Sequence, residues 1–438
     1  MFSFRSVAAL LASALHVSSA NARGFYAHYM VGGIIEGTDH AARDIDDASA
    51  LGFDAFALNI GAPDADWATG AIKQLFDYAD NTDFKLFFSV DFYQESNIDA
   101  YNKLLQDYVG RPSYLRAGDD NYPVVSSFSV GEHDPARFRK WKWESLGDQM
   151  YLLPNADNAP GYSNPGSWFQ GDWGNTVDGV FGWETAWPWG GNQPENVSSG
   201  FDTEVLNAAH SQGKTYMAPL SPLQFKDCCG QKNYRIGEVN LPQRMAQLLT
   251  LSPDFVEFIT WNDAGESHYI GNIWSESQVN EDIKKYANNE DWPHFGWQPL
   301  IASFGNAYKH GHGPDGMRPQ SDDEVIGAMW YRTFLSSGSC NGNKPANWKS
   351  AVDAVNWALV VDQGVTDFKV RVSSGGQIIS ETKLSPGLNY AASAGVRQGA
   401  QKIEVVRGNT VVKVAKSAKQ VTDGSEHCFY NFQVAGLE

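Results

Sequence analysis

The sequence predicts an α/β protein: a (β/α)8 TIM barrel followed by a smaller C-terminal β-sandwich domain. Eight apolar, β-branched runs recur up to residue 263 at intervals of roughly 25 to 40 residues, the length of one βα unit. Helical patterns lie between these runs, and from about residue 340 the pattern changes to short alternating runs. The length of 438 residues suits one large domain and one smaller one.

Each predicted barrel strand is a short apolar run. The eight runs lie at residues 25–31, 53–61, 84–92, 122–130, 149–156, 178–185, 214–222 and 255–263. Between them, residues 38–52 and 66–81 show helical spacing of apolar side chains and reach Gly52 and Asn81 as stop signals. The runs lack polar alternation, as expected for strands buried on both faces. A doubly wound open sheet is the alternative, but no G-x-G-x-x-G follows the first strand.

The predicted barrel spans residues 23–335, and the predicted β-sandwich accessory domain spans residues 336–438. In the second range, alternating runs such as 367–376 and 402–408 end in tight glycine turns, which favours a β-sandwich.

Residues 1–22 form a secretory signal pattern. Arg5 precedes an apolar stretch of about 11 residues, and small residues follow it. This stretch is too short to span a bilayer, and no later segment reaches about 18 apolar residues. We expect a soluble mature chain that begins near Asn21 or Arg23 and is secreted, extracellular or in the cell wall.

Charge and composition point to a neutral or cationic partner. Acidic residues outnumber basic residues by 51 to 33, so the net charge of −18 repels nucleic acid and anionic membranes. The 15 Trp, 18 Tyr and 24 Phe exceed what a core needs, and exposed rings stack well on sugars. We expect a monomer that binds a polysaccharide, with no cofactor, no nucleic acid and no membrane partner.

Four cysteines in an exported chain allow two disulfides. The simplest pairing joins Cys340 to Cys428, closing the C-terminal domain, and joins the adjacent Cys228 and Cys229 in a strained bridge. Asn196, in the sequence N-V-S, is the one glycosylation sequon.

Polar residues recur where the predicted strands end, which is where barrel enzymes place their chemistry. They are His28, Asn59, Asp91, Ser127, Ser129, Asn155, Glu184, Ser221, Asn262, Asp263 and Glu266. Because buried polar groups are costly unless paired, a purely structural barrel has little reason to gather them. This convergence predicts a functional site.

Carboxylates dominate that set, and tryptophans surround them. Asp91, Glu184, Asp263 and Glu266 share the rim with Trp183, Trp187, Trp189 and Trp261. Paired carboxylates in an aromatic cleft are typical of glycoside hydrolases. One acid donates a proton to the leaving oxygen, and the other activates a water molecule or attacks the anomeric carbon.

A metal-dependent hydrolase is an alternative on the same scaffold. Histidines are present at 28, 133, 268, 310 and 312, but neither H-x-H after the first strand nor H-E-x-x-H occurs. A serine nucleophile is also disfavoured, because the sequence contains no G-x-S-x-G motif. A non-catalytic carbohydrate-binding barrel is a further alternative, which the retained acids disfavour.

Five segments of the chain resemble fungal glycoside hydrolase family 71, whose members are endo-acting α-1,3-glucanases, also called mutanases. They are FYAHYMVGG at the N-terminus, FDAFALNIG, FFSVDF, CCG at 228–230 and ITWNDAGESHYIG after the eighth strand. The resemblance implies a barrel with a β-sandwich companion and hydrolysis of α-1,3-glucan, from fungal walls or as mutan, with inversion at the anomeric carbon. Because the histidine motifs of metal hydrolases are missing, we expect no metal at the site.

The resemblance also implies roles for single residues. The catalytic carboxylates are Asp263 and Glu266, with Asp91 a further essential acid; Ala264 stands where we expect an aromatic residue. We assign Glu266 as general acid and Asp263 as general base, with Asp91 as the competing base. The residues expected to contact sugar are His28, Asn59, Glu184, Trp261, Asn262 and His268.

Overall fold

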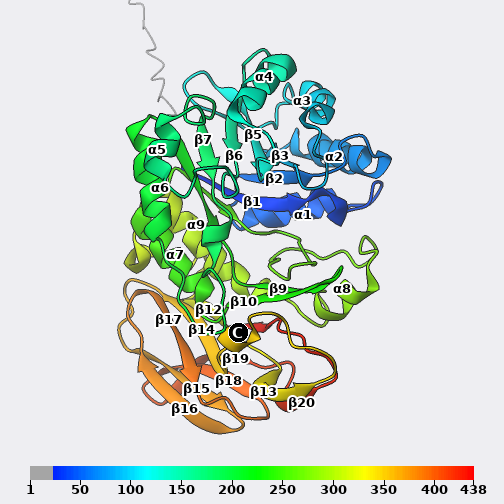
Figure 1. Cartoon of the computed structure of the whole chain (residues 1–438). Coiled ribbons are helices and arrows are strands. Elements are labelled where there is room, and N and C mark those ends of the chain that lie inside the picture. Colours follow the sequence, from blue (N-terminus) through cyan, green and yellow to red (C-terminus); the bar gives the residue numbers. More distant parts are fainter. Residues whose placement is uncertain (1–22) are drawn as a thin grey trace, which may run out of the picture.

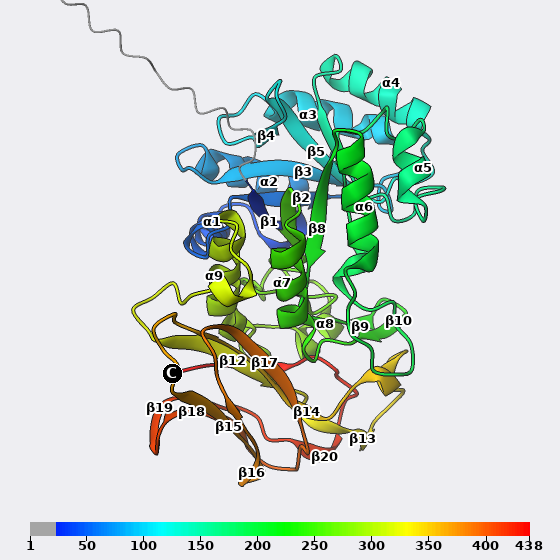
Figure 2. The same ribbon diagram turned by 90° about the vertical axis from the view of Figure 1, so that its left-hand side faces the viewer.

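The computed structural model describes residues 23–438, so the predicted signal pattern at residues 1–22 lies outside the described residues. The chain forms two parts (Figure 1): a parallel sheet with surrounding helices, and antiparallel sheets formed by the C-terminal residues. Figure 2, turned by 90°, shows helices α6, α7 and α9 in front of the parallel strands.

Eight parallel strands form a curled sheet, and each coincides with a predicted run, with β1 beginning one residue earlier than predicted. They are β1 (Gly24–Met30), β2 (Ala55–Ile60), β3 (Lys85–Asp91), β5 (Tyr122–Phe128), β6 (Tyr151–Pro154), β7 (Gly179–Phe181), β8 (Thr215–Leu220) and β11 (Phe255–Phe258). The ladder runs β6-β5-β3-β2-β1-β11-β8-β7, with short β4 (Arg116–Ala117) antiparallel to β5. A single parallel bridge joins Asn155, after β6, to Phe181 of β7. The predicted mixed α/β architecture is confirmed.

Helices alternate with these strands. They are α1 (His40–Ala50), α2 (Asp66–Ala79), α3 (Asn102–Tyr108), α4 (Pro135–Leu146), α5 (Pro165–Gln170), α6 (Gly200–Ser211), α7 (Asn240–Leu251), α8 (Glu281–Tyr286) and α9 (Gln298–Lys309). Helix α4 illustrates the local signals, because the Asp134 side chain accepts from the Arg137 N–H and Pro135 occupies the first turn. Gly147 then ends the helix in the left-handed region, at φ 61°.

Side chains of β1 alternate between the helices and the interior of the sheet. Phe25 packs edge-on against Phe304 of α9, with ring centroids 5.5 Å apart, and Tyr29 donates a hydrogen bond to Asp44 of α1. His28 lies on the opposite face and contacts Glu257 of the neighbouring strand β11. Polar side chains of successive strands therefore meet inside the curl.

The C-terminal part contains two four-stranded antiparallel sheets. One has the order β17-β14-β12-β21, with bounds Gly387–Ala394, Ala354–Val361, Val325–Tyr331 and Gln433–Gly436. The other has the order β16-β15-β18-β19, with bounds Gln377–Lys383, Phe368–Ser374, Gln401–Arg407 and Thr410–Lys416. Both contribute to one apolar cluster, which includes Trp357 and Val370. Strand β12 precedes residue 335, so this part already begins within the range expected for the barrel.

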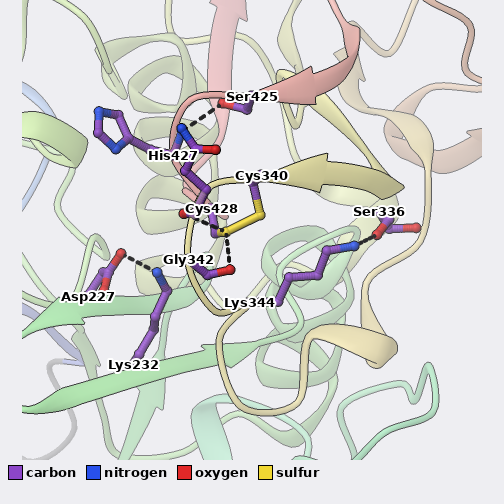
Figure 3. The surroundings of a disulfide bond; sticks show 10 residues. Asp227, Lys232, Ser336, Cys340, Gly342, Lys344, Ser425, His427 and Cys428 are labelled. Carbon is purple, nitrogen blue, oxygen red and sulfur yellow. Dashed lines mark hydrogen bonds and ion pairs between the residues drawn. A yellow bond between two sulfur atoms is a disulfide. The ribbon is translucent and has the colours of Figure 1, made fainter.

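The predicted disulfide between Cys340 and Cys428 is present, with an S–S distance of 2.03 Å. It lies near the paired strands β13 (Phe334–Cys340) and β20 (Thr422–Ser425). Figure 3 shows its surroundings, which include the Asp227–Lys232 ion pair.

The predicted bridge between Cys228 and Cys229 is wrong. Both cysteines are free, and their sulfur atoms lie 2.9 Å apart, well beyond the roughly 2.05 Å of a covalent bond. Cys228 ends β9 (Gln224–Cys228), which forms a hairpin with β10 (Gln231–Arg235), and Cys229 starts its turn at φ 59°. Cys228 is buried and Cys229 is exposed, and their two thiols are in contact without a covalent bond.

Buried polar contacts join the two parts of the chain. Arg332, just after β12, forms a 2.7 Å ion pair with Glu238, and both side chains are almost fully buried. Asn431 donates to the carbonyl of Tyr286 and also contacts His294 at 3.0 Å. Within residues 23–438, no helix combines the length and the apolar character needed to cross a membrane.

Candidate active site

The chain after β11 folds back into a tight turn that presents two carboxylates. Asp263 Oδ1 accepts a hydrogen bond of 3.0 Å from the Glu266 N–H, which closes the turn. A Cβ at Gly265 would lie 3.2 Å from Asp263 Oδ1, so glycine suits this position. The Thr260 N–H donates to the carbonyl of His268, which returns the chain to the strand. Asp263, Glu266 and His268 each offer one polar atom within 4.8 Å of the others.

Glu266 is surrounded by hydrogen-bond donors. The Gln224 amide donates to Oε2, His268 Nε2 lies 3.1 Å from Oε2, and Lys226 Nζ lies 3.4 Å from Oε1. Burial alone would raise the pKa of this carboxyl, but His268, Lys226 and Gln224 together lower the pKa of Glu266 to about 2. Glu266 is therefore ionised at neutral pH.

Asp263 has fewer donors than Glu266. Burial raises the pKa of Asp263; His268 opposes this rise, and the neighbouring Glu266 charge adds to it. When two close carboxylates compete for a proton, the one with fewer donors keeps it. These directions favour Asp263 as the protonated partner, the reverse of the roles expected from the sequence.

Asp91 ends β3 and is the third carboxylate of the site. Its Oδ1 accepts from the N–H groups of Tyr93, at 2.9 Å, and Gln94, at 3.3 Å. Burial raises the pKa of Asp91, and these two N–H groups, His28 and Asn59 oppose the rise. The structure thus brings His28, Asn59 and Asp91 together on three successive strands, as the sequence predicts.

The two remaining polar candidates on the rim are engaged by protein partners. Glu184, at the start of a 3-10 turn (Glu184–Ala186), pairs with Arg235 of β10 at 2.7 Å. The Arg235 guanidinium also lies 5.3 Å from the ring centroid of Trp187. His268 is fully buried, and its ring lies 5.8 Å from that of Trp187.

Trp261 and Asn262 have packing roles instead of the expected sugar contacts. Trp261 is 0% exposed and packs against Phe53 and Phe56, away from the interior of the sheet. The Asn262 side chain bonds both the N–H and the carbonyl of Met30, at 2.8 and 3.1 Å. Neither side chain is free to bind a sugar in this structure.

Other strand-end polar groups are satisfied by the backbone. The Ser127 hydroxyl donates to the Ser129 carbonyl, the Ser221 hydroxyl to the Ile259 carbonyl, and the Asn155 amide to the Phe181 carbonyl. These contacts hold the three side chains against the protein, and the residues support the rim.

Sequence reasoning missed residues that shape the site. Lys226 reaches it from the polar β9–β10 hairpin, which no apolar pattern predicts. Asp157, two residues after the Asn155 position, accepts from the N–H groups of Trp183 and Glu184, both at 2.8 Å. Its position after the fifth predicted strand could have identified it. Glu257 was hidden inside the apolar run of β11.

A row of aromatic rings leads away from the carboxylates. The Trp183 and Phe128 ring centroids are 4.7 Å apart, and those of Phe128 and Tyr93 are 5.5 Å apart. Tyr93, two residues beyond Asp91, is 68% exposed. Exposed rings beside a carboxylate cluster provide stacking surfaces for sugars.

Asp263, Glu266 and His268 form the one cluster with metal-ligand spacing within residues 23–438. Two carboxylates and one imidazole suit zinc in number and type. However, Lys226 Nζ already lies 3.4 Å from Glu266, and a cation bound there would be repelled by this ammonium group. The arrangement therefore suits proton transfer better than metal binding.

Comparisons with known proteins agree with this chemistry. The sequence model of the family described as Glycosyl hydrolase family 71 matches residues 21–436. A mutanase of Penicillium rubens is 30% identical over 424 residues, covering 93% of this chain and 87% of the relative. A glucan endo-1,3-alpha-glucosidase of Schizosaccharomyces pombe is 33% identical over 337 residues, covering 72% of each chain.

A solved structure shares the fold. The family 99 endo-alpha-mannosidase from Bacteroides thetaiotaomicron superposes with a TM-score of 0.50 at 10% identity, covering 66% of this chain and 98% of that one. At this identity the likeness concerns the fold alone.

Proposed function

The chain belongs to glycosyl hydrolase family 71, and on that premise we propose that it cleaves internal α-1,3-glucosidic bonds of α-1,3-glucan. The turn between Asp263 and Glu266 carries this proposal. It holds two carboxylates whose pKa values are shifted in opposite directions, with aromatic rings beside them, as glycoside hydrolysis requires. The relatives named for mutan and 1,3-α-glucan support the choice of glucan and linkage.

The spacing of the carboxylates limits the mechanism. One oxygen of Asp263 and one of Glu266 lie within 4.8 Å of each other. Inverting enzymes hold their two carboxyl groups about 6.5 to 9.5 Å apart, to leave room for the attacking water. Inversion, which the family resemblance implies, therefore requires a base from outside this pair.

Each of the three acids then has a distinct role. Asp263 donates the proton to the leaving oxygen, because burial and the Glu266 charge favour its protonated form. Asp91, oriented by the N–H groups of Tyr93 and Gln94, activates the water. Glu266, held ionised by Lys226 and His268, keeps the proton on Asp263.

Substrate recognition follows from the residues around the acids. His28, Asn59 and Glu184 provide polar groups at the strand ends, and Tyr93, which is 68% exposed, provides a ring on which a sugar of the glucan chain stacks. His268, which is buried against Glu266, acts through that carboxylate.

The domain organisation of this proposal follows the strand ladders. Residues 23 to about 316 form the (β/α)8 barrel, closed at the Asn155–Phe181 bridge, and the sheets from Val325 onward form the β-sandwich domain. The protein acts as a secreted monomer. Asn196 is its N-glycosylation site, since its side chain is exposed and bonded to Gln243 only through Oδ1.

The proposal is tested by incubating the full mature chain with insoluble α-1,3-glucan and measuring reducing ends. Internal cleavage releases oligosaccharides of mixed length, whereas β-1,3-glucan, the control, stays intact. If α-1,3-glucan releases no sugar, the proposed activity is wrong, and the result favours a non-catalytic carbohydrate-binding barrel. NMR of the first product reads the anomer: β supports inversion with Asp91 as base, and α excludes it.

A metal-dependent hydrolase is the second candidate, favoured by the donor set of Asp263, Glu266 and His268. Dialysis against a chelator distinguishes the two. The proton-transfer mechanism predicts full activity after dialysis, whereas activity that is lost and restored by zinc supports the second candidate.

A further inference from the structure

A buried histidine–carboxylate pair lies inside the curled sheet beside the proposed site. His28 extends from β1 and Glu257 from the adjacent β11, and His28 Nδ1 lies 2.6 Å from Glu257 Oε1. The exposed fractions are 1% for His28 and 0% for Glu257. A buried carboxylate is costly unless it is paired, and here His28 is the partner.

Glu257 differs from a buried carboxylate that serves stability alone. Glu238 accepts hydrogen bonds from Tyr234, Gly237, Arg332 and Val352, so both its oxygens are satisfied. Glu257 Oε2 has no partner among residues 23–438, and its Oε1 contacts only the imidazole. Its one strong interaction is therefore with His28.

The other side of the imidazole faces the site. The His28 and Trp183 ring centroids are 5.0 Å apart, and a positive charge on His28 lowers the pKa of Asp91. With Nδ1 committed to Glu257, Nε2 is the nitrogen left for a sugar hydroxyl. A carboxylate partner on one nitrogen of a histidine fixes both the tautomer and the orientation of the ring.

We propose that Glu257 is a positioning residue for the glucanase reaction, which fixes the ring of His28 so that Nε2 meets the sugar beside Asp91. The inference rests on the proposed function, which supplies the sugar and the role of Asp91. His28 lowers the pKa of Asp91, so the position of its ring also affects the proposed base. The titratable groups facing the pair are Asp91 from β3 and Tyr26 from β1.

Two substitutions separate the charge of Glu257 from its reach. Glu257→Gln keeps the length and removes the charge, and Glu257→Asp keeps the charge and shortens the reach. Both are expected to lower kcat on α-1,3-glucan oligosaccharides by about 10- to 100-fold, with a smaller change in KM. In Glu257→Gln, the acidic limb of the pH profile moves to higher pH, because a displaced His28 ring no longer lowers the pKa of Asp91 to the same extent.

Asp44→Asn is the matched control, because Asp44 is another fully buried acid, which bonds Tyr29 on the face of β1 opposite His28. It is expected to lower thermal stability and leave the pH profile in place. If both Glu257 variants keep the wild-type kcat and pH profile, or only repeat the behaviour of the control, the proposal is wrong.

Nitrogen NMR of the histidine rings gives a readout that needs no activity. The His28 signals, identified by their loss in His28→Gln, are expected to show one fixed tautomer in the wild type and exchange between tautomers in Glu257→Gln. A fixed tautomer in a protein that does not cleave α-1,3-glucan would reject the proposed function and retain the pairing. If Glu257→Gln does not fold, the wild-type spectrum decides, since freely exchanging tautomers there overturn the inference.

Discussion

Lys226 Nζ lies 3.4 Å from Glu266 Oε1 and thereby connects the β9–β10 hairpin to the carboxylates after β11. This ammonium group helps to lower the pKa of Glu266, and the negative charge of Glu266 adds to the rise in the pKa of Asp263. The hairpin is therefore part of the proposed catalytic arrangement, although it lies outside the parallel sheet.

Lys226→Met is expected to reduce kcat about tenfold or more. Without the cation, the pKa of Glu266 rises, and Glu266 competes with Asp263 for the proton. Lys232→Met is the control, because Lys232 pairs with Asp227 on the same hairpin, at 2.7 Å, away from the acids. Initial rates on α-1,3-glucan check this prediction, and equal losses in the two variants would contradict it.

The assignment of the acids can be tested with Asp263→Asn, Glu266→Gln and Asp91→Asn. An aryl glycoside whose leaving group needs no protonation should restore the rate of the variant that lacks the proton donor. We expect this rescue for Asp263→Asn and not for Asp91→Asn, which lacks the base. Rescue of Glu266→Gln alone would instead establish the roles expected from the sequence.

The low pKa of Glu266 predicts a specific dependence of stability on pH. Because its pKa falls from 4.5 to about 2 on folding, Glu266 stabilises the native state above about pH 4.5, and this contribution is lost as the pH falls towards 2. Glu266 is partly exposed, so we expect about 1 to 2 kcal/mol after screening.

Urea unfolding at pH 7 and pH 3 measures this contribution. The difference between the two pH values should be smaller in Glu266→Gln than in the wild type. Glu204→Gln, on the exposed face of α6, is the control and should match the wild type. A Glu266→Gln curve parallel to the wild type at both pH values would reject the prediction.

The sequence predicts the strands well, because burial on both faces leaves continuous apolar runs such as that of β2. It does not predict which face a residue beyond a strand end will occupy. Trp261 was expected on the rim, but the chain leaves β11 at Phe258 and turns this ring against Phe56. Lys226 could not be predicted, because only tertiary folding brings the polar hairpin beside Glu266.

In the site, as in the fold, local sequence predicts some residues, whereas others are brought in only by tertiary folding. Asp91 was predicted because it directly ends a buried strand. Glu257 interrupts an apolar run, and its partner lies 229 positions away in the sequence, so no local pattern reveals the pair. The protonation states of Asp263 and Glu266 depend on donors from the hairpin, which sequence spacing does not contain.

Tyr93 is expected to bind a distant sugar of a long glucan. It is 68% exposed at the end of the aromatic row, so Tyr93→Ala removes a stacking surface worth on the order of 1 kcal/mol, or roughly a fivefold rise in KM for long chains. Trp143 on α4 is equally exposed, at 69%, and Trp143→Ala is the control. An unchanged KM for long chains in Tyr93→Ala would exclude this subsite. A rise in KM for a short aryl glycoside that equals the rise for long chains would exclude it too.

The C-terminal part is expected to be required for the fold of the barrel. Arg332→Met leaves Glu238 buried without its cation, which typically costs about 3 to 5 kcal/mol, so the melting temperature should fall by several degrees. Arg371→Met, on a half-exposed surface pair with Glu381, should change it little. Because Glu238 also bonds the Tyr234 hydroxyl, beside Arg235 in β10, loss of the Arg332 pair should loosen the hairpin that carries Lys226. Hydrogen exchange of residues 224–235 measures this loosening, and exchange that stays at the wild-type rate would show that the C-terminal part does not support the site.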